Sequence, residues 1–234
     1  MKRSLIIVAA LSLAAIPGAQ KSSSAGESPL SNTSPHAVGP SQTSNLTAPT
    51  IISTNTFNGT TTLVFDIAGA QSWDLQGDPS NTVLSVPLAN GDEMTGIGWD
   101  VNLTTVGGSW LSEAAFYFDG SDQDLMGLFL TPGAGDDFAG TSSYSSGGVI
   151  DLAGAGIPNI PVLADGNLYI ECFESFDDAA DAVDADWTAG STLTIVHTGD
   201  GGGGVPTVGQ WGLISLTVLL FAGVVMRSVS RKTS

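Results

Sequence analysis

Short stretches of alternating apolar and polar residues recur along the middle of this chain. In the stretch 61–67, Leu63, Phe65 and Ile67 fall on one face of an extended strand. The stretch 95–106 places four large apolar residues on one face in the same way: Ile97, Trp99, Val101 and Leu103. An alternation with a period of two is typical of a strand that buries one of its faces. Further stretches rich in β-branched and aromatic residues lie at 114–119, 125–130, 149–152, 168–173 and 191–197.

Turn signals containing Gly, Asn, Asp or Pro separate these stretches, at 58–59, 90–92, 119–120, 132–133 and 165–166. Many short strands joined by such turns are typical of an all-β protein. We therefore expect a single antiparallel β-sandwich, jelly-roll-like, over residues 50–199. Within it, residues 177–186 place Ala179, Ala180 and Ala182 among acidic residues, which predicts either a short helix or an acidic loop.

The composition changes on both sides of this domain. Residues 26–49 are rich in Ser, Thr, Pro and Asn and contain few large apolar residues, which is typical of a disordered spacer. Residues 200–204 contain four glycines and read as a flexible hinge. The residues between them are enough for one domain with its own core.

The N-terminus has the three parts of a secretory signal peptide. Lys2 and Arg3 form a positive beginning, and the apolar stretch 5–16 follows. Small residues then occur between Gly18 and Ala25, where a signal peptidase would cut. The apolar stretch is too short for a convincing membrane span. We predict a signal peptide over residues 1–25.

An uncharged apolar segment lies near the C-terminus. Residues 208–226 would span about 30 Å as a helix, which matches the hydrocarbon core of a bilayer. Trp211 lies near its outer end, and Arg227, Arg231 and Lys232 follow it as a stop-transfer signal. These features predict one transmembrane helix with its C-terminus in the cytoplasm. The alternative is a buried core helix, because the strictly apolar part is short for a span.

The residues before this helix resemble a known sorting signal. The motif consists of Val205, Pro206, Thr207, Val208, Trp211 and Gly212. It resembles the IPTL-CTERM signal, a relative of the PEP-CTERM signals of Gram-negative bacteria, with valine in place of isoleucine and leucine at its first and fourth positions. The resemblance covers residues 205–234 only. It implies recognition by an exosortase, a membrane-embedded cysteine transpeptidase, with cleavage near Pro206 and Thr207.

Positive and negative charges occupy different parts of the chain. The net charge is −17, and all six basic residues lie in the segments 2–21 and 227–232. Every one of the 23 acidic residues lies between Glu27 and Asp200. Such a polyanionic domain repels nucleic acids and anionic lipids, so we exclude a nucleic-acid partner. Divalent cations, calcium above all, are its natural counterions, although an acidic surface adapted to seawater or brine explains the same composition.

One acidic loop offers a calcium site. Asp119, Asp122 and Asp124 fall within six residues between two expected strands, and Ca²⁺ prefers several oxygen ligands. The spacing does not match an EF-hand loop. Further acids lie at 136–137 and 174–186. Each of these clusters also fits a solvated loop without a ligand, and no other cofactor is indicated.

Aromatic platforms for sugars are the other candidate sites. Trp99 shares a face with Ile97, so we expect it in the core, whereas Trp110 and Trp73 lie in or near turns and are candidates for the surface. The lone cysteine, Cys172, lies on an expected strand and is most simply buried, because it has no partner for an internal disulfide.

A catalytic site is not indicated. A Ser-His-Asp triad needs a histidine, but His36 lies in the spacer and His197 closes the last expected strand. With one cysteine the chain has no His and Cys cluster of the kind that binds zinc. No basic side chain of the domain is available to stabilise an oxyanion. We therefore predict that the protein is not an enzyme.

Together these features predict an exported bacterial protein. We expect it to be held at the inner membrane, with its N-terminus outside and its C-terminus inside, before an exosortase-like transpeptidase releases it to the cell surface or medium. Its expected role is structural or adhesive, in contact with exopolysaccharide. The alternatives are a carbohydrate- or calcium-binding surface module and, third, a surface hydrolase.

Overall fold

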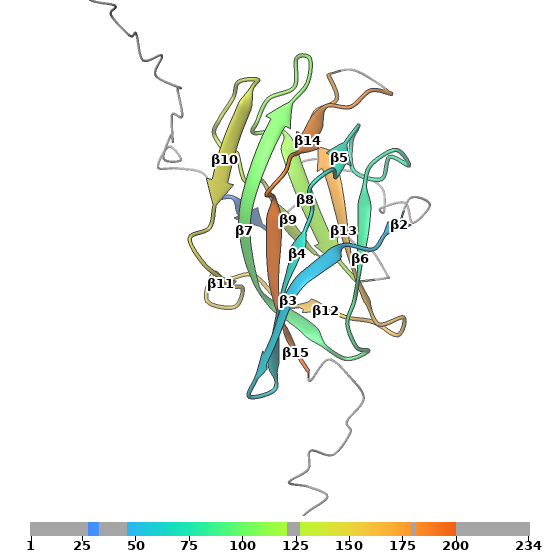
Figure 1. Ribbon diagram of the computed structural model, residues 1–234, viewed down its shortest axis with the longest axis vertical. Helices are drawn as coiled ribbons and strands as arrows, with labels where there is room; N and C mark the ends of the chain where they lie inside the picture. Colours follow the sequence, from blue (N-terminus) through green and yellow to red (C-terminus); the bar gives the residue numbers. More distant parts are fainter. Residues whose placement is uncertain (1–27, 33–45, 121–126, 179–180, 200–234) are drawn as a thin grey trace, which may run out of the picture.

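The regular structure of the described part of the chain consists of β-strands. The computed structural model describes residues 28–32, 46–120, 127–178 and 181–199 (Figure 1). In these residues there is no helix, and the strands form two sheets. The prediction of an all-β protein is therefore confirmed. The predicted signal peptide, hinge and transmembrane helix all lie outside the described residues.

The first sheet has six strands in the order β1-β9-β8-β13-β6-β2. Their bounds are β1 (Leu30–Ser31), β2 (Leu46–Thr47), β6 (Val83–Pro87), β8 (Ala114–Asp119), β9 (Leu128–Leu130) and β13 (Asn167–Glu174). All neighbours pair antiparallel except β2 and β6, which run parallel. The centre of the sheet is the β8–β13 pair, which has Cys172 opposite Phe116.

The second sheet has nine strands, with the path β3-β4-β15-β7-β14-β5 and three short strands on the long strand β7. Their bounds are β3 (Thr50–Phe57), β4 (Thr60–Asp66), β5 (Gln71–Ser72), β7 (Glu93–Thr105), β10 (Thr141–Ser145), β11 (Ile150–Asp151), β12 (Ile160–Pro161), β14 (Ala185–Trp187) and β15 (Thr192–Thr198). All of these strands pair antiparallel. The two-residue turn between β3 and β4 is formed by Asn58 and Gly59, both at positive φ, as the sequence signal predicts.

The larger of two clusters of buried apolar residues lies between the two sheets, in a sandwich-like arrangement, and the smaller one consists of Ala115, Tyr117, Phe129 and Phe173. The apolar faces predicted from the alternation are buried, including Phe65, Ile97 and Trp99. Phe116 in the first sheet stacks on Trp187 in the second, with ring centroids 4.1 Å apart, and this contact joins the two sheets. Cys172 is buried in the same core, as expected, and burial raises the pKa of its thiol.

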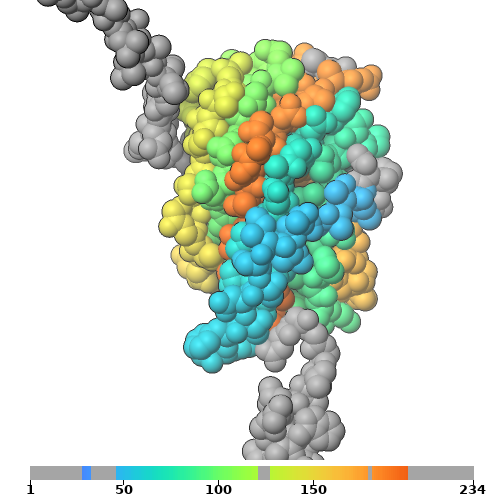
Figure 2. Space-filling view, in the orientation of Figure 1, coloured from blue at the N-terminus to red at the C-terminus, as the bar shows by residue number. Residues whose placement is uncertain are grey.

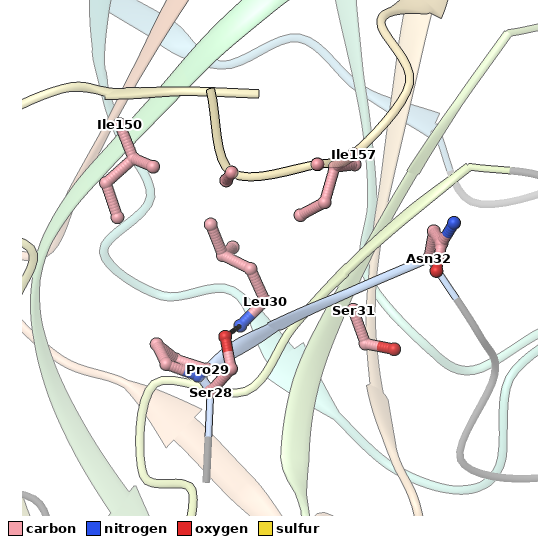
Figure 3. Close-up of a pocket in the computed structure, with 9 residues that line it drawn as sticks. Ser28, Pro29, Leu30, Ser31, Asn32, Ile150 and Ile157 are labelled. Carbon is pink, nitrogen blue, oxygen red and sulfur yellow. Dashed lines mark hydrogen bonds between the residues drawn. The ribbon is translucent and has the colours of Figure 1, made fainter. Parts of the chain in front are cut away.

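Part of the predicted spacer is folded onto the domain. Within residues 26–49, for which the sequence predicts disorder, residues 28–32 and 46–49 are described and contribute β1 and β2. Leu30 is only 8% exposed because β1 pairs with β9. Its side chain extends toward Ile150 and Ile157, beside a hollow of about 410 Å³ (Figure 3). The segment has too few apolar residues to reveal this from its sequence.

Candidate functional site

Four loops meet at one end of the two sheets, at the top of Figure 1. They are the loops 73–82 after β5, 106–113 after β7, 131–140 after β9 and 175–184 after β13. Backbone hydrogen bonds tie them together, for example from the Ser175 amide to the Glu113 carbonyl and from the Ser112 amide to the Asp136 carbonyl. We call this end the acidic pole; its acids are Asp74, Asp78, Glu113, Asp136, Asp137, Glu174, Asp177, Asp178, Asp181 and Asp184.

Two of these acids are buried. Glu174 is 0% exposed, and its Oε1 accepts a hydrogen bond of 2.8 Å from the Ser72 hydroxyl. Asp184 is 1% exposed, and its Oδ1 accepts one of 2.9 Å from the Ser109 hydroxyl. The other oxygen of each carboxylate, Glu174 Oε2 and Asp184 Oδ2, is buried with no hydrogen-bond partner in the described part of the chain.

Burial of these carboxyl groups favours their neutral form. Desolvation, strengthened by the nearby Asp184 and opposed by the Ser72 hydrogen bond, raises the pKa of Glu174 from 4.5 to about 9. Desolvation likewise raises the pKa of Asp184 from 3.8 to about 6, with added repulsion from Asp177. The described residues contain no Lys or Arg that could offset these charges.

The loop 73–82 is held in place by one asparagine. Asn81 Oδ1 accepts hydrogen bonds from the amides of Trp73 and Asp74, at 2.9 and 3.2 Å. Its Nδ2 donates to the Leu75 carbonyl and to Glu171 Oε1 on β13, at 3.0 and 2.9 Å. A network with this many bonds fixes the loop against the sheet.

This loop lines an open hollow of about 330 Å³. Its polar lining is formed by Asp74, Gln76, Asp78 and Asp177. Desolvation raises the pKa of Asp74, and the neighbouring Asp177 raises it further because the two carboxyl groups lie close together. The chemistry suits a cation or the hydroxyl groups of a sugar. No group of three or more Asp, Glu, His or Cys side chains among the described residues is arranged to hold a metal ion.

The acidic pole also exposes large apolar side chains. Each of its four loops carries at least one, namely Leu75, Val106, Trp110, Phe138 and Phe176, which are 37–54% exposed. Trp110 is therefore on the surface, as the sequence indicates, and the partly exposed Trp73 lies at the same pole. Exposed aromatic groups beside carboxylates are typical of a ligand-binding surface.

The calcium site predicted at Asp119, Asp122 and Asp124 is described only in part. Asp119 is buried at the end of β8, where it accepts hydrogen bonds from the Tyr117 hydroxyl and the Gly120 amide. Asp122 and Asp124 lie outside the described residues. The loop 177–186, predicted as a short helix or an acidic loop, contains no helix in its described residues and leads into β14.

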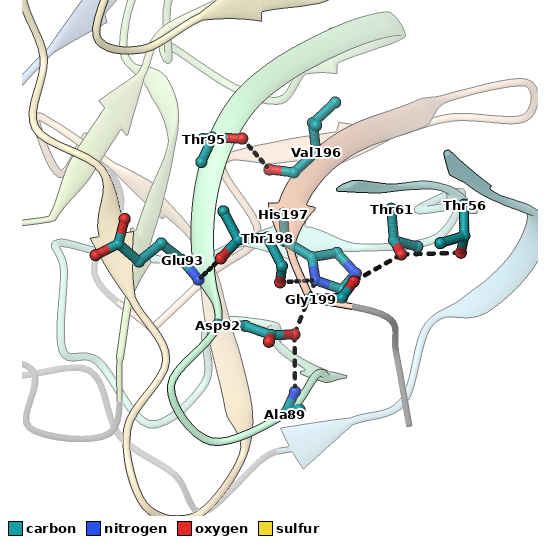
Figure 4. A network of polar contacts seen from close by, with 10 residues as sticks. All are labelled: Thr56, Thr61, Ala89, Asp92, Glu93, Thr95, Val196, His197, Thr198 and Gly199. Carbon is teal, nitrogen blue, oxygen red and sulfur yellow. Dashed lines mark hydrogen bonds and ion pairs between the residues drawn. The ribbon is translucent and has the colours of Figure 1, made fainter. Parts of the chain in front are cut away.

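The opposite end of the sheets holds a second polar network (Figure 4). His197 Nδ1 lies 2.9 Å from Asp92 Oδ2, and both side chains are buried. The Thr61 hydroxyl donates to the Gly199 carbonyl, and the Gly199 amide donates to the Gly59 carbonyl. We call this end the exit pole, because the described chain ends there. At Gly199 a Cβ would lie 2.0 Å from Asp92 Oδ1, so only glycine fits.

Sequence reasoning missed the buried acids Glu174 and Asp184 and the partner of His197. Nothing in the sequence around Asp92 marks it, because its contact with His197 joins segments 105 residues apart. The sorting motif at 205–212 and the stop-transfer residues at 227–232 lie outside the described residues. Among the residues that the structure describes, no helix is long and apolar enough to cross a membrane. No family model, curated protein or solved structure matches this chain.

Proposed function

We propose that this protein is an exported bacterial protein of the cell surface or extracellular matrix, with a structural or adhesive role. In this proposal residues 1–25 direct export, the helix 208–226 holds the chain in the inner membrane, and an exosortase-like transpeptidase acts at the motif 205–212. The domain is then a jelly-roll-like sandwich presented to the outside.

The single observation that carries the proposal is that the described chain ends, at Gly199, at the end of the sheets opposite the acidic pole. β15 ends at Thr198, opposite Thr60 and beside the Asn58-Gly59 turn. The four loops of the acidic pole lie at the other ends of the strands. If a tether continues from Gly199 to the membrane, the acidic pole and its exposed apolar side chains face away from the membrane.

The distribution of charge supports the same orientation. All basic residues lie in the two terminal segments that the proposal places at the membrane, and all acids lie between them. An acidic, salt-tolerant exterior suits a protein that is exposed to the medium. The basic residues after position 226 suit the cytoplasmic side of a membrane.

Fractionation with intact-mass measurement tests this function in the native bacterium. We expect loss of the signal peptide in every mature form, and a released form that ends within the motif. The double change Pro206→Ala and Trp211→Ala should leave the uncleaved protein in the membrane, whereas the control Trp110→Ala should be processed normally. A full-length chain in the cytosol, or a wild-type tail that is never removed, would overturn the sorting proposal.

A second candidate function is a carbohydrate- or calcium-binding module, because aromatic groups and carboxylates share the acidic pole. In this case a polysaccharide such as alginate, with or without CaCl₂, should change the tryptophan fluorescence of the full-length protein and raise its melting temperature. The change Trp110→Ala should remove the fluorescence response, while Val149→Ala, on the exposed surface near β11, should not. An unchanged melting temperature under all these conditions would exclude this role.

A further inference from the structure

β3 is an exposed edge of the nine-stranded sheet. It is the outermost strand of the path, and in the described part of the chain it pairs only with β4. All eight of its residues are exposed. In Figure 2 this strand, in light blue, crosses the front of the molecule and reaches its lower left corner. One side of its backbone therefore presents N–H and C=O groups that no other described strand uses.

The sequence of β3 lacks the usual protection of an edge strand. Such strands normally carry charged side chains or proline, which prevent pairing with another chain. β3 contains neither, and the register shift in its pairing with β4, between Ile51 and Ser53, leaves residues 53–57 as a regular edge. It exposes Ile51, Ile52 and Phe57 by 43%, 57% and 74%. A long, uncharged edge with β-branched and aromatic residues is suited to pair with a further strand.

Charge favours a second copy of this chain at this edge. Two copies with a net charge of −17 repel each other, so they approach most easily through an uncharged surface. No charged residue occurs between Glu27 and Asp66, the stretch that contains β3 and most of β4. The strand β10 is also an uncharged edge, but it consists of Thr, Ser and Tyr and lacks exposed large apolar groups.

We propose that two copies of this protein pair through β3, antiparallel and around a two-fold axis, so that one sheet continues through both. Each copy uses the same edge, and the contact is therefore complete in a dimer. Main-chain hydrogen bonds supply the affinity of such strand addition. Growth into a filament would need a second edge of the same kind, and β10 does not provide it.

The dimer has a consequence for the tails. β3 and β15 run in the same direction, because each pairs antiparallel with β4. Gly199 therefore follows β15 at the same end as Phe57. Antiparallel pairing of two β3 strands places the two exit poles at opposite ends. If the proposed surface display holds, a pair of copies can connect two components of the cell surface or matrix that lie on opposite sides of the dimer, which gives the adhesive role a physical basis.

The experiment measures the association state of the purified full-length protein in mild detergent, by light scattering over a range of concentrations. We expect a monomer–dimer equilibrium without larger species. The regular part of β3, residues 53–57, is centred on Asn55, so we place the two-fold axis there. The change Asn55→Asp then puts like charges close together across the axis and should weaken dimerisation about tenfold. The matched control Ser143→Asp introduces the same charge in β10 and should leave the dissociation constant unchanged. Thermal melts of both variants check that the fold is intact.

Cross-linking provides a second measurement that does not depend on affinity. Directly opposite residues of antiparallel strands can bring their Cβ atoms to about 4.5 Å, which is within reach of a disulfide. The native Cys172 is buried, so a cysteine introduced at Asn55 is the exposed thiol among the described residues. Mild oxidation should cross-link Asn55→Cys into a dimer and leave Ser143→Cys a monomer.

The proposal would be overturned by a wild-type protein that stays monomeric at 100 times the lowest concentration measured by light scattering, together with an Asn55→Cys variant that does not cross-link. A monomer that binds lipid vesicles through Phe57, or one that binds a different protein through β3, would also overturn it. None of these results depends on export or tail cleavage. Failure of this inference is therefore distinguishable from failure of the proposed function.

Discussion

The buried Glu174 makes the stability of this protein depend on pH in a direction opposite to that of most paired carboxylates. Its carboxyl group is 0% exposed, accepts one hydrogen bond from Ser72, and has a second oxygen without a hydrogen-bond partner. The change Glu174→Gln keeps an oxygen that can accept the Ser72 hydrogen bond. It also removes the group that must lose a proton as the pH rises.

The expected magnitude follows from the shift of the pKa. The unfolded chain titrates near 4.5 and the folded protein at about 9, so the folded state holds the proton more tightly. The free energy of unfolding is highest below pH 4.5 and falls as the pH rises toward 9, by about 1.4 kcal/mol per pH unit. Asp184, whose pKa is raised to about 6, contributes to this fall only below that pH. Between pH 6.5 and 8.5 Glu174 alone therefore removes about 3 kcal/mol.

Urea unfolding of the full-length protein, followed by tryptophan fluorescence with a chelator present, measures this effect. We expect the wild type to lose stability across the window from pH 6.5 to 8.5 and Glu174→Gln to lose little. At pH 8.5 the variant should be the more stable protein. The exposed Asp100→Asn serves as the control and should follow the wild type. A wild-type profile that is flat in this window, or identical to that of Glu174→Gln, would refute the reasoning.

Two substitutions and one labelling experiment test the packing. Phe116→Ala removes the ring that stacks on Trp187 and should cost about 3–5 kcal/mol of unfolding free energy in urea titrations; a cost below about 1 kcal/mol would contradict the packed core. Gly133→Ala should lower the melting temperature, because its Cβ would lie 2.3 Å from the Leu111 carbonyl oxygen, and an unchanged melting temperature would show that the contact is looser. Cys172 should react with a thiol reagent only after denaturation, because its thiol is buried and its pKa is raised; rapid labelling of the native protein would disprove this.

The strands β4, β7, β8, β13 and β15 were predicted from the sequence, whereas β3, β6, β10 and β14 were not. The stretches 61–67 and 95–106 correspond to β4 and β7, because each of these strands buries one face and the alternation records it. β3 and β10 have no such alternation of large apolar groups. They are held by backbone pairing to a neighbour rather than by burial of a face. A rule based on apolar periodicity has no signal for a strand of this kind.

The sequence predicted that the candidate site is acidic, but it did not predict where the acidic residues lie in the fold. The sequence shows a surplus of acids, but it does not show that Glu174 and Asp184 are buried while Asp178 is exposed. Burial follows from the pairing of β13, β14 and β5, which brings Ser72 and Ser109 from distant parts of the chain to the two carboxylates. The exposed apolar side chains of the acidic pole were not predictable as a group either, because they come from four separate loops.

The acid surplus links the stability of the domain to its self-association. Repulsion among the acids opposes the folded state, and the same repulsion opposes the approach of two copies through β3. Salt screens exposed charges that lie farther apart than about 8 Å at physiological ionic strength, whereas it acts little on buried groups such as Glu174. Added salt should therefore stabilise the fold and tighten the β3 dimer together, while leaving the dependence on pH between 6.5 and 8.5 in place. The two effects on stability are thus separable. Salt changes the repulsion among exposed acids, whereas pH changes the protonation of the buried carboxyl groups.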